Sequence, residues 1–184
     1  MTVHVALIRA IGPATHARMS MKDLAEGCRA AGLAKVSTYI QTGNVIVDTR
    51  LSPRRIGGIV DSVLQGFGLG QSFGFGNDVV VRRADALAAI VAADPYPDAA
   101  ATRPDALAVM FLPRPPEADR LAALLRHDGP ERICLVGPDL CIDYPGGVSG
   151  SRLLPGAIER RLGMTGTARN WNTVRRLNAL AAAF

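Results

Sequence analysis

The segment Arg169-Asn170-Trp171-Asn172 collects the side chains best suited to bind a ligand. An arginine guanidinium is a forked donor that suits phosphate or carboxylate groups, and a tryptophan ring can stack on a base. A structural interpretation competes with this one, in which Trp171 is buried and Asn172 caps the helix that follows. We favour the structural interpretation and keep Arg169, Asn170 and Trp171 as candidate ligand-binding residues.

A loop rich in glycine and serine, residues 145–152, is the second candidate. Glycines let backbone N–H groups approach a ligand, serines donate hydrogen bonds, and the N-terminus of a following helix favours negative charge. The loop matches neither the P-loop pattern nor the dinucleotide-binding fingerprint, so we prefer a turn in which Ser151 caps a helix. The candidate ligand-binding residues of this loop are Gly147, Ser149, Ser151 and Arg152.

Three polar residues near the first strands complete the candidate set. Arg9 and Asn44 are candidate ligand-binding residues because such groups follow strand ends or precede helices. His16 lies in the loop after the first strand and could act as an acid or base. No nucleophile motif and no pair of carboxylates stands out, so the sequence carries no catalytic signature.

The composition indicates a globular protein, with 48% hydrophobic and 20% charged residues. No apolar run reaches membrane-spanning length and the chain opens on a strand-like segment, so we expect a cytoplasmic protein with no membrane partner. The net charge of +5 could indicate an anionic partner. The basic residues are mostly scattered arginines, however, which favours a solvated surface over a nucleic-acid patch.

The three cysteines are Cys28, Cys134 and Cys141, with no C-x-x-C pair and no histidine at ligand spacing. We therefore predict no metal site and no cofactor. Reduced thiols are the default in a cytoplasmic protein, so a disulfide between Cys134 and Cys141 is not expected.

The hydrophobic pattern predicts the order strand–helix–strand–strand–helix–strand twice, which is the ferredoxin-like βαββαβ arrangement. Strands are expected at residues 3–8, 36–41, 44–48 and 79–81, and again at 107–112, 133–136, 140–143 and 165–169. The predicted fold class is α/β (α+β), with two ferredoxin-like subdomains in tandem and an additional C-terminal helix. The predicted domains are residues 1–83, a connecting helix and linker at 84–104, and residues 105–184.

The two expected hairpins predict which residues face each other. A two-residue turn at Thr42-Gly43 would place Ile40 opposite Val45, and a turn at Gly137-Pro138 would place Cys134 opposite Cys141. Such sheets can bind RNA through two or three aromatic rings on the face that helices leave open, and this face offers one. An RNA-binding sheet is therefore not expected. The side chains that we expect on this open face are Tyr39, Gln41, Asn44 and Arg82, of which only Tyr39 is aromatic.

The segments THARMSM, TYIQTGNVIV, DYPGGVSGSR and ARNWNTVRRL resemble the domain-of-unknown-function family 1697. The resemblance spans almost the whole chain and implies small bacterial α/β proteins of ferredoxin-like type, without a known activity. Two segments depart from the family pattern. Arg9-Ala10-Ile11-Gly12-Pro13 stands where the family has a glycine-rich loop, and Ser151-Arg152 stands where it often has a serine–lysine pair.

Three functions fit these features. The first is a binding protein for an anionic small molecule or nucleic acid at the junction of the subdomains. The second is a small enzyme that acts on a phosphorylated or acyl substrate through His16 or Ser149. The third is a protein–protein adaptor that uses the open edges of its sheets.

Overall fold

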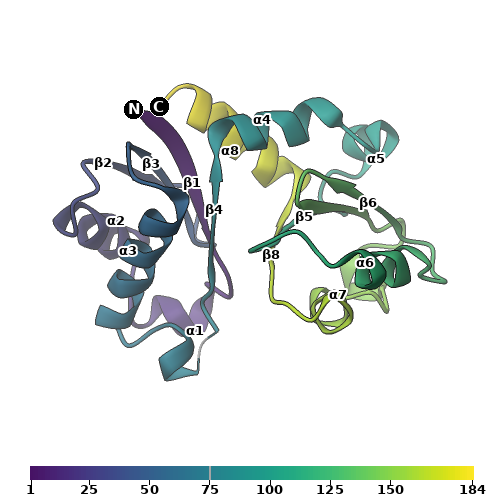
Figure 1. The fold of residues 1–184 in the computed structure, drawn as a ribbon, viewed down its shortest axis with the longest axis horizontal. Helices are drawn as coiled ribbons and strands as arrows, with labels where there is room; N and C mark the ends of the chain where they lie inside the picture. Colours follow the sequence, from purple (N-terminus) through teal and green to yellow (C-terminus); the bar gives the residue numbers. More distant parts are fainter. Residues whose placement is uncertain (75) are drawn as a thin grey trace. The chain divides into compact units, whose positions relative to one another are not determined.

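The computed structural model describes residues 1–74 and 76–184, and these fall into two compact units (Figure 1). The N-terminal unit consists of Met1–Leu87 together with Leu177–Phe184, and the C-terminal unit consists of Ala88–Arg176. The predicted boundaries at residues 83 and 104 stay predictions. No helix in the described residues is long and apolar enough to cross a membrane.

Each unit contains one four-stranded sheet. The strands of the first sheet are β1 (Thr2–Ile8), β2 (Lys35–Thr38), β3 (Asn44–Thr49) and β4 (Val79–Arg83). The strands of the second sheet are β5 (Leu107–Phe111), β6 (Arg132–Val136), β7 (Asp139–Asp143) and β8 (Thr167–Asn170). The α-helices are α1 (Pro13–His16), α2 (Met21–Ala30), α3 (Pro53–Gly66), α4 (Ala84–Ala93), α5 (Pro97–Thr102), α6 (Ala118–Leu125), α7 (Pro155–Leu162) and α8 (Trp171–Ala182), with short 3-10 turns η1 (Gln71–Phe73) and η2 (Val148–Gly150).

The two sheets share one topology. Their strand orders are β2-β3-β1-β4 and β6-β7-β5-β8, and all pairs are antiparallel. The two orders are equivalent, because β5, β6, β7 and β8 occupy the same positions in the second sheet as β1, β2, β3 and β4 in the first. Two ferredoxin-like βαββαβ units therefore follow one another in the chain, and the predicted fold class is confirmed.

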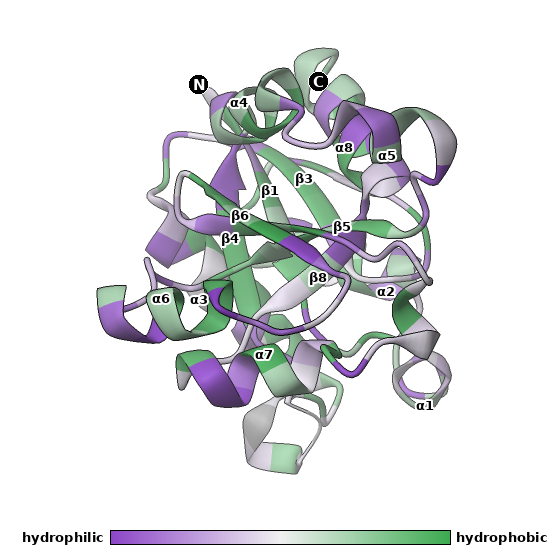
Figure 2. Cartoon of the chain, turned by 90° about the vertical axis from the view of Figure 1, so that its right-hand side faces the viewer, coloured by the Kyte–Doolittle hydropathy of each residue, from purple (hydrophilic) through white to green (hydrophobic). Residues whose placement is uncertain are grey.

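The core of the N-terminal unit lies between its sheet and the helices α2 and α3 (Figure 1). Figure 2 shows β1 and β3 as largely hydrophobic segments. A serine caps each of these helices: Ser20 accepts the N–H of Asp23 over 3.1 Å, and Ser52 accepts the N–H of Arg55 over 3.3 Å. These caps start the two helices so that Leu24, Ile56 and other apolar side chains are buried.

The core of the C-terminal unit lies between its sheet and the helices α6 and α7. Leu124, Ile158 and Leu162 of these helices are buried with Leu140 and Ile142 of β7. The opposite face of the same sheet is unusually polar, because Asp139 and Asp143 of β7 are also fully buried there. That polar face needs internal hydrogen-bond partners.

The predicted register of the first hairpin is wrong. Thr38 faces Val45 in the structure. β2 ends at Thr38 and β3 begins at Asn44, so the loop has five residues, 39–43, instead of two. Ile40, expected inside, has a positive φ of 50° and is 43% exposed. The shift of two residues leaves each strand residue on its expected face, because side chains alternate with a period of two.

The predicted register of the second hairpin is confirmed: Leu135 faces Leu140 and Cys134 faces Cys141. The expected linker between the two subdomains, which is rich in proline and alanine, contains a helix. Six of its residues form α5, which starts with a proline at its first position.

Gly43 gives a test of the first hairpin. It has a φ of 76°, and a Cβ atom there would lie 2.6 Å from Cγ1 of Ile11. We expect Gly43→Ala to lower the free energy of unfolding by about 1–3 kcal/mol, because both backbone strain and a close contact are introduced. Gly58→Ala is the matched control: Gly58 lies inside α3 with open space around it, so that alanine should stabilise by about 0.5–1 kcal/mol. Urea denaturation measures the free energy of unfolding of both variants, which should fall in Gly43→Ala and rise in Gly58→Ala.

Candidate functional site

The two asparagines around Trp171 bind one carboxylate. Nδ2 of Asn170 and Nδ2 of Asn172 donate to Oδ1 of Asp105 over 3.1 and 3.0 Å. Oδ1 of Asn170 accepts the N–H of Thr173 over 2.9 Å and so caps the first turn of α8. The prediction that Asn172 is the cap is therefore wrong, since α8 begins at Trp171 and Asn170 takes that role.

The neighbouring Arg169 is nine-tenths buried in the C-terminal unit. Its Nη1 donates to Oγ1 of Thr167 over 2.7 Å and to the carbonyl oxygen of Ala168 over 2.8 Å. Burial lowers the pKa of Arg169 to about 10. The guanidinium therefore remains charged at neutral pH, and these two hydrogen bonds direct it to its own strand.

Trp171 is the anchor of this segment. Only 2% of its surface is exposed, and its backbone N–H donates to the carbonyl oxygen of Pro104 over 3.2 Å. The indole thus serves as a wall of the C-terminal unit, and little of its face is accessible to a stacked base.

The glycine-rich loop does not open a helix as expected. α7 begins at Pro155 after Leu154, so the prediction that Ser151 caps a helix is also wrong. Gly147 has a φ of 79° and donates its N–H to the carbonyl oxygen of Tyr144 over 2.9 Å. The remaining two candidates of the loop, Ser149 and Arg152, are exposed.

Ser151 connects the loop to Glu131. Its hydroxyl donates to Oε1 of Glu131, and Oγ accepts the N–H of Leu153 over 2.8 Å. Nε2 of His127 lies 2.7 Å from Oε2 of the same carboxylate. Burial opposes the charged form of Glu131, but the hydrogen bonds from Ser151 and His127 outweigh it and lower its pKa. The hydroxyl is bonded to a carboxylate here, and this arrangement holds the loop in place.

The N-terminal candidates hold loops of their own unit. Nη1 of Arg9 donates to the carbonyl oxygen of Gly76 over 3.3 Å, and Nε2 of His16 lies 2.8 Å from the carbonyl oxygen of Gln41. Asn44 is fully buried and donates to the carbonyl oxygen of Tyr39 over 3.1 Å. These residues belong to a different unit from the Trp171 segment, so a shared site at the junction stays a prediction.

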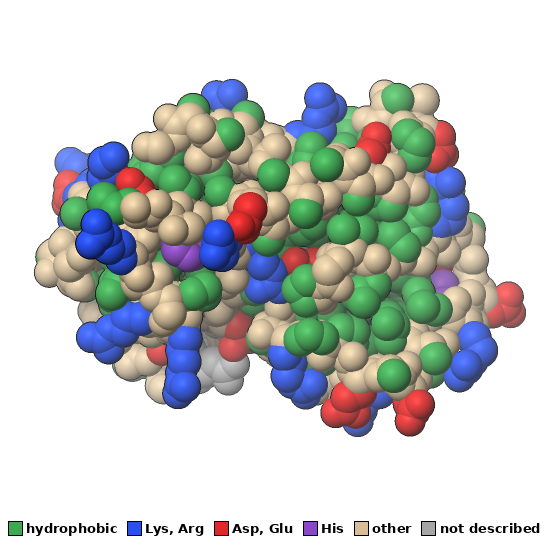
Figure 3. All heavy atoms as spheres, turned by 45° about the horizontal axis from the view of Figure 1, so that its top comes forward, with side chains coloured by type: hydrophobic (Ala, Val, Ile, Leu, Met, Phe, Trp, Pro, Cys, Tyr) green, Lys and Arg blue, Asp and Glu red, His purple; other side chains and the backbone are tan. Residues whose placement is uncertain are grey.

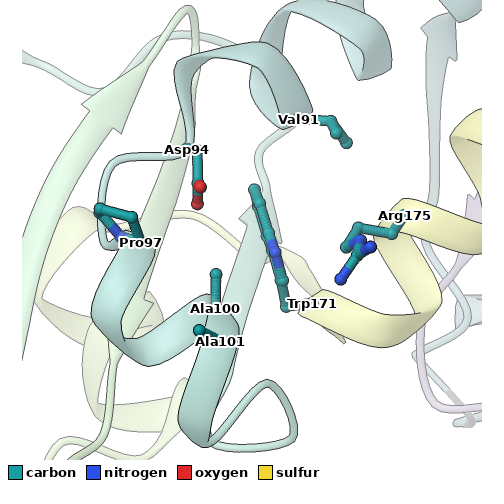
Figure 4. A pocket seen from close by; sticks show the side chains of 7 residues that line it. All are labelled: Val91, Asp94, Pro97, Ala100, Ala101, Trp171 and Arg175. Atoms are coloured by element: carbon teal, nitrogen blue, oxygen red, sulfur yellow. The ribbon is translucent and has the colours of Figure 1, made fainter.

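A pocket of about 330 Å³ lies beside Trp171 within the C-terminal unit (Figure 4). It is formed by the end of α4, by α5 and by the first turns of α8. The seven lining residues are Val91, Asp94, Pro97, Ala100, Ala101, Trp171 and Arg175. Most of them are small or apolar, and the two charged residues have opposite signs.

Asp94 is the polar group that distinguishes this pocket. Its Oδ1 is buried, and it has no hydrogen-bond partner in the part of the chain that the structure describes. In Figure 4 the indole of Trp171 stands between Asp94 and the exposed Arg175. A carboxylate oxygen that is shielded from water and lacks a donor favours a ligand that brings one.

Sequence reasoning found Trp171 but missed Asp94 and Arg175. The dipeptide Asp94-Pro95 indicates only the end of a helix, and Arg175 lies in an ordinary helical pattern. The positive φ of Asp94, 32°, is a conformation that sequence alone does not reveal. Such strain concentrates at functional sites.

A four-residue ion-pair network supports one wall of the pocket. Asp143 is fully buried and accepts hydrogen bonds from Nε and Nη2 of Arg103, over 3.0 and 2.8 Å, and from Nε of Arg132 over 2.8 Å. Both arginines also bind Asp98 of α5, and the guanidinium of Arg132 lies 4.7 Å from the ring centre of Tyr96. The hydrogen bond from Arg132 is the main cause that lowers the pKa of Asp98. Two positive and two negative charges are thus paired, and α5 is fixed to the sheet.

Residues 1–140 match the model of the DUF1697 family, described as a protein family of unknown function. The match covers more than half of the chain, so this protein belongs to that family, as the resemblance of its motifs implied. Among solved structures, it is similar to the conserved bacterial protein SP0830 from Streptococcus pneumoniae, with a TM-score of 0.71 and 17% sequence identity over 99% of both chains. No curated protein matches the sequence. These similarities confirm the fold and assign no activity.

The hydrogen bond from Ser151 to Glu131 predicts a specific pH dependence of stability. The pKa of Glu131 in the folded state lies below its ordinary value of 4.5, so its contribution is present above pH 4.5 and is lost as the pH falls through the folded value. Ser151→Ala should lower the free energy of unfolding by about 1–2 kcal/mol at neutral pH, and the difference from wild type should shrink on acidification. Urea denaturation at several pH values measures this.

Ser149→Ala is the matched control, because Ser149 lies exposed in the same loop. It should change the free energy of unfolding by less than about 0.5 kcal/mol at every pH. If Ser151→Ala lowered the free energy of unfolding by the same amount at low pH as at neutral pH, the role assigned to Glu131 would be contradicted.

Proposed function

We propose that the protein binds a small molecule with an anionic group in the pocket beside Trp171. The anionic group is recognised by Arg175, and a second group of the ligand, an amine or another hydrogen-bond donor, is recognised by Asp94. The observation that carries the proposal is the buried Oδ1 of Asp94, which has no donor in the described part of the chain although it lines a pocket. A purely anionic ligand would be repelled by this carboxylate, so both groups are needed.

The size of the pocket supports a small ligand. About 330 Å³ lies at the lower end of the range for small-molecule sites. Nucleic acid has less support, because the basic side chains on the face shown in Figure 3 are scattered among acidic ones. Binding of nucleic acid, a role as an enzyme or an adaptor, and a cytoplasmic location stay predictions from the sequence.

The only tryptophan of the chain lines the pocket, so its fluorescence reports binding there. The probes are aminoalkyl phosphates of increasing chain length, beginning with phosphoethanolamine, compared with inorganic phosphate and with the matching alkylamines. We expect an aminoalkyl phosphate to change the fluorescence in a saturable way. Inorganic phosphate alone and an alkylamine alone should bind more weakly. Arg175→Gln should weaken binding of the phosphate-containing probes about fivefold, the value of an exposed ion pair of about 1 kcal/mol.

Asp94→Asn separates the two halves of the proposal. Asp94→Asn should weaken the binding of an aminoalkyl phosphate. It should leave the binding of inorganic phosphate unchanged or make it tighter, because a repulsive charge is removed. Arg176→Gln, one residue further along the exposed side of α8, is the matched control and should bind like wild type. The proposal is contradicted if no probe alters the fluorescence, or if Arg176→Gln loses as much affinity as Arg175→Gln. If none of these probes binds but an oligonucleotide does, with an affinity that falls as salt is added, the nucleic-acid prediction is favoured.

A further inference from the structure

Two cysteines and a tyrosine meet on the polar face of the second sheet. Cys134 of β6 and Cys141 of β7 are directly opposite each other, and both are free thiols. Residues in this position have Cβ atoms about 4.5–5.5 Å apart, and a disulfide needs about 3.5–4.5 Å. Side-chain rotation together with a small shift of the edge strand β6 can therefore bring the two sulfur atoms together. Tyr96 lies over the same face, since Arg132 contacts its ring and is two residues from Cys134 on one strand.

Two neighbouring side chains favour the thiolate form of Cys134 through hydrogen bonding. Cys141 is the stronger influence, and Tyr96 adds a second bond. Against the opposing effect of burial, these bonds lower the pKa of Cys134 to about 6. The pKa of Cys141 is raised by the same hydrogen bond and by burial, and that of Tyr96 is raised chiefly by burial. One sulfur is therefore a thiolate at neutral pH, and both of its neighbours keep their protons.

Accessibility makes the pair asymmetric. Cys134 is partly exposed on the edge strand β6, whereas Cys141 is fully buried. The third cysteine, Cys28, is buried in the N-terminal core, and burial raises its pKa to about 11. An oxidant from solution thus meets the thiolate of Cys134 first, and Cys28 serves as an internal reference.

We propose that Cys134 and Cys141 form a reversible redox pair that responds to hydrogen peroxide, independently of the ligand pocket. The thiolate of Cys134 attacks one peroxide oxygen, the O–O bond breaks, and the leaving hydroxide takes a proton and departs as water. The product is a sulfenic acid at Cys134. The sulfur of Cys141 then attacks the sulfur of Cys134, the S–O bond breaks, and the hydroxide leaves as water with the proton of Cys141. Overall, two thiols and one peroxide give one disulfide and two waters.

The test uses the full chain, first reduced and then treated with hydrogen peroxide at neutral pH. Mass spectrometry should show the loss of two hydrogen atoms and a peptide cross-link between Cys134 and Cys141, both reversed by dithiothreitol. In Cys141→Ser, dimedone should trap the sulfenic acid at Cys134. In Cys134→Ser, neither the cross-link nor an adduct at Cys141 should form.

The pH dependence of alkylation gives a second readout that a merely structural cysteine would not produce. The rate of iodoacetamide labelling at Cys134 should rise to a plateau with a midpoint near pH 6. Tyr96→Phe keeps the ring against Arg132 but removes the hydroxyl donor, so it should move this midpoint to higher pH. The proposal is overturned if the wild-type midpoint is that of an ordinary thiol, about 8.5. It is also overturned if Cys28 or Cys141 is oxidised before Cys134.

Discussion

The buried carboxylate of Asp143 is the constraint on which the functional face of the C-terminal unit depends. Removing such a charge from water costs several kcal/mol unless its oxygens are well bonded. Arg103 binds both oxygens in the forked geometry that guanidinium and carboxylate favour, and Arg132 adds a third bond from the strand opposite. The cost of burial is thus offset only when the segment that carries Arg103 lies against the sheet.

Two features follow from that arrangement. α5 lies between Tyr96 and Arg103, so the network fixes both of its ends, and its alanines form one wall of the pocket. Tyr96 is held over Arg132 and beside the sulfur of Cys134, which keeps a hydroxyl donor at the thiolate. The ligand pocket and the thiol pair are different proposals, and one ion-pair network positions residues of both.

The sequence predicts the fold well because both units depend on local patterns. Alternating strands, the caps Ser20 and Ser52, and the two-residue turn at Gly137-Pro138 are each legible within a few residues, and the resulting sheets have the expected topology. The first hairpin fails because the positive φ of Ile40 lengthens a loop that looks like a tight turn. A non-glycine residue gives no sign of that conformation.

The site is less predictable because its contacts are distant in sequence. Asp143 binds Arg103 forty residues away, and α5 lies in a stretch whose prolines and alanines indicate a linker. The segment around Trp171 is conspicuous in the sequence because of its asparagines, but those side chains bind Asp105 and cap α8. The feature that supports binding is instead an aspartate before a proline, which ordinarily indicates a turn.

Hydrogen exchange of the α5 amides in Asp143→Asn tests the central role of this carboxylate most directly. Asp139→Asn is the matched comparison, because Asp139 is equally buried on β7 but accepts the N–H of Leu112 over 3.0 Å. We expect the amides of residues 100–103 to lose protection in Asp143→Asn beyond any global loss of stability, and to keep their relative protection in Asp139→Asn. Equal loss across the C-terminal unit in both variants, or unchanged α5 protection in Asp143→Asn, would contradict this account.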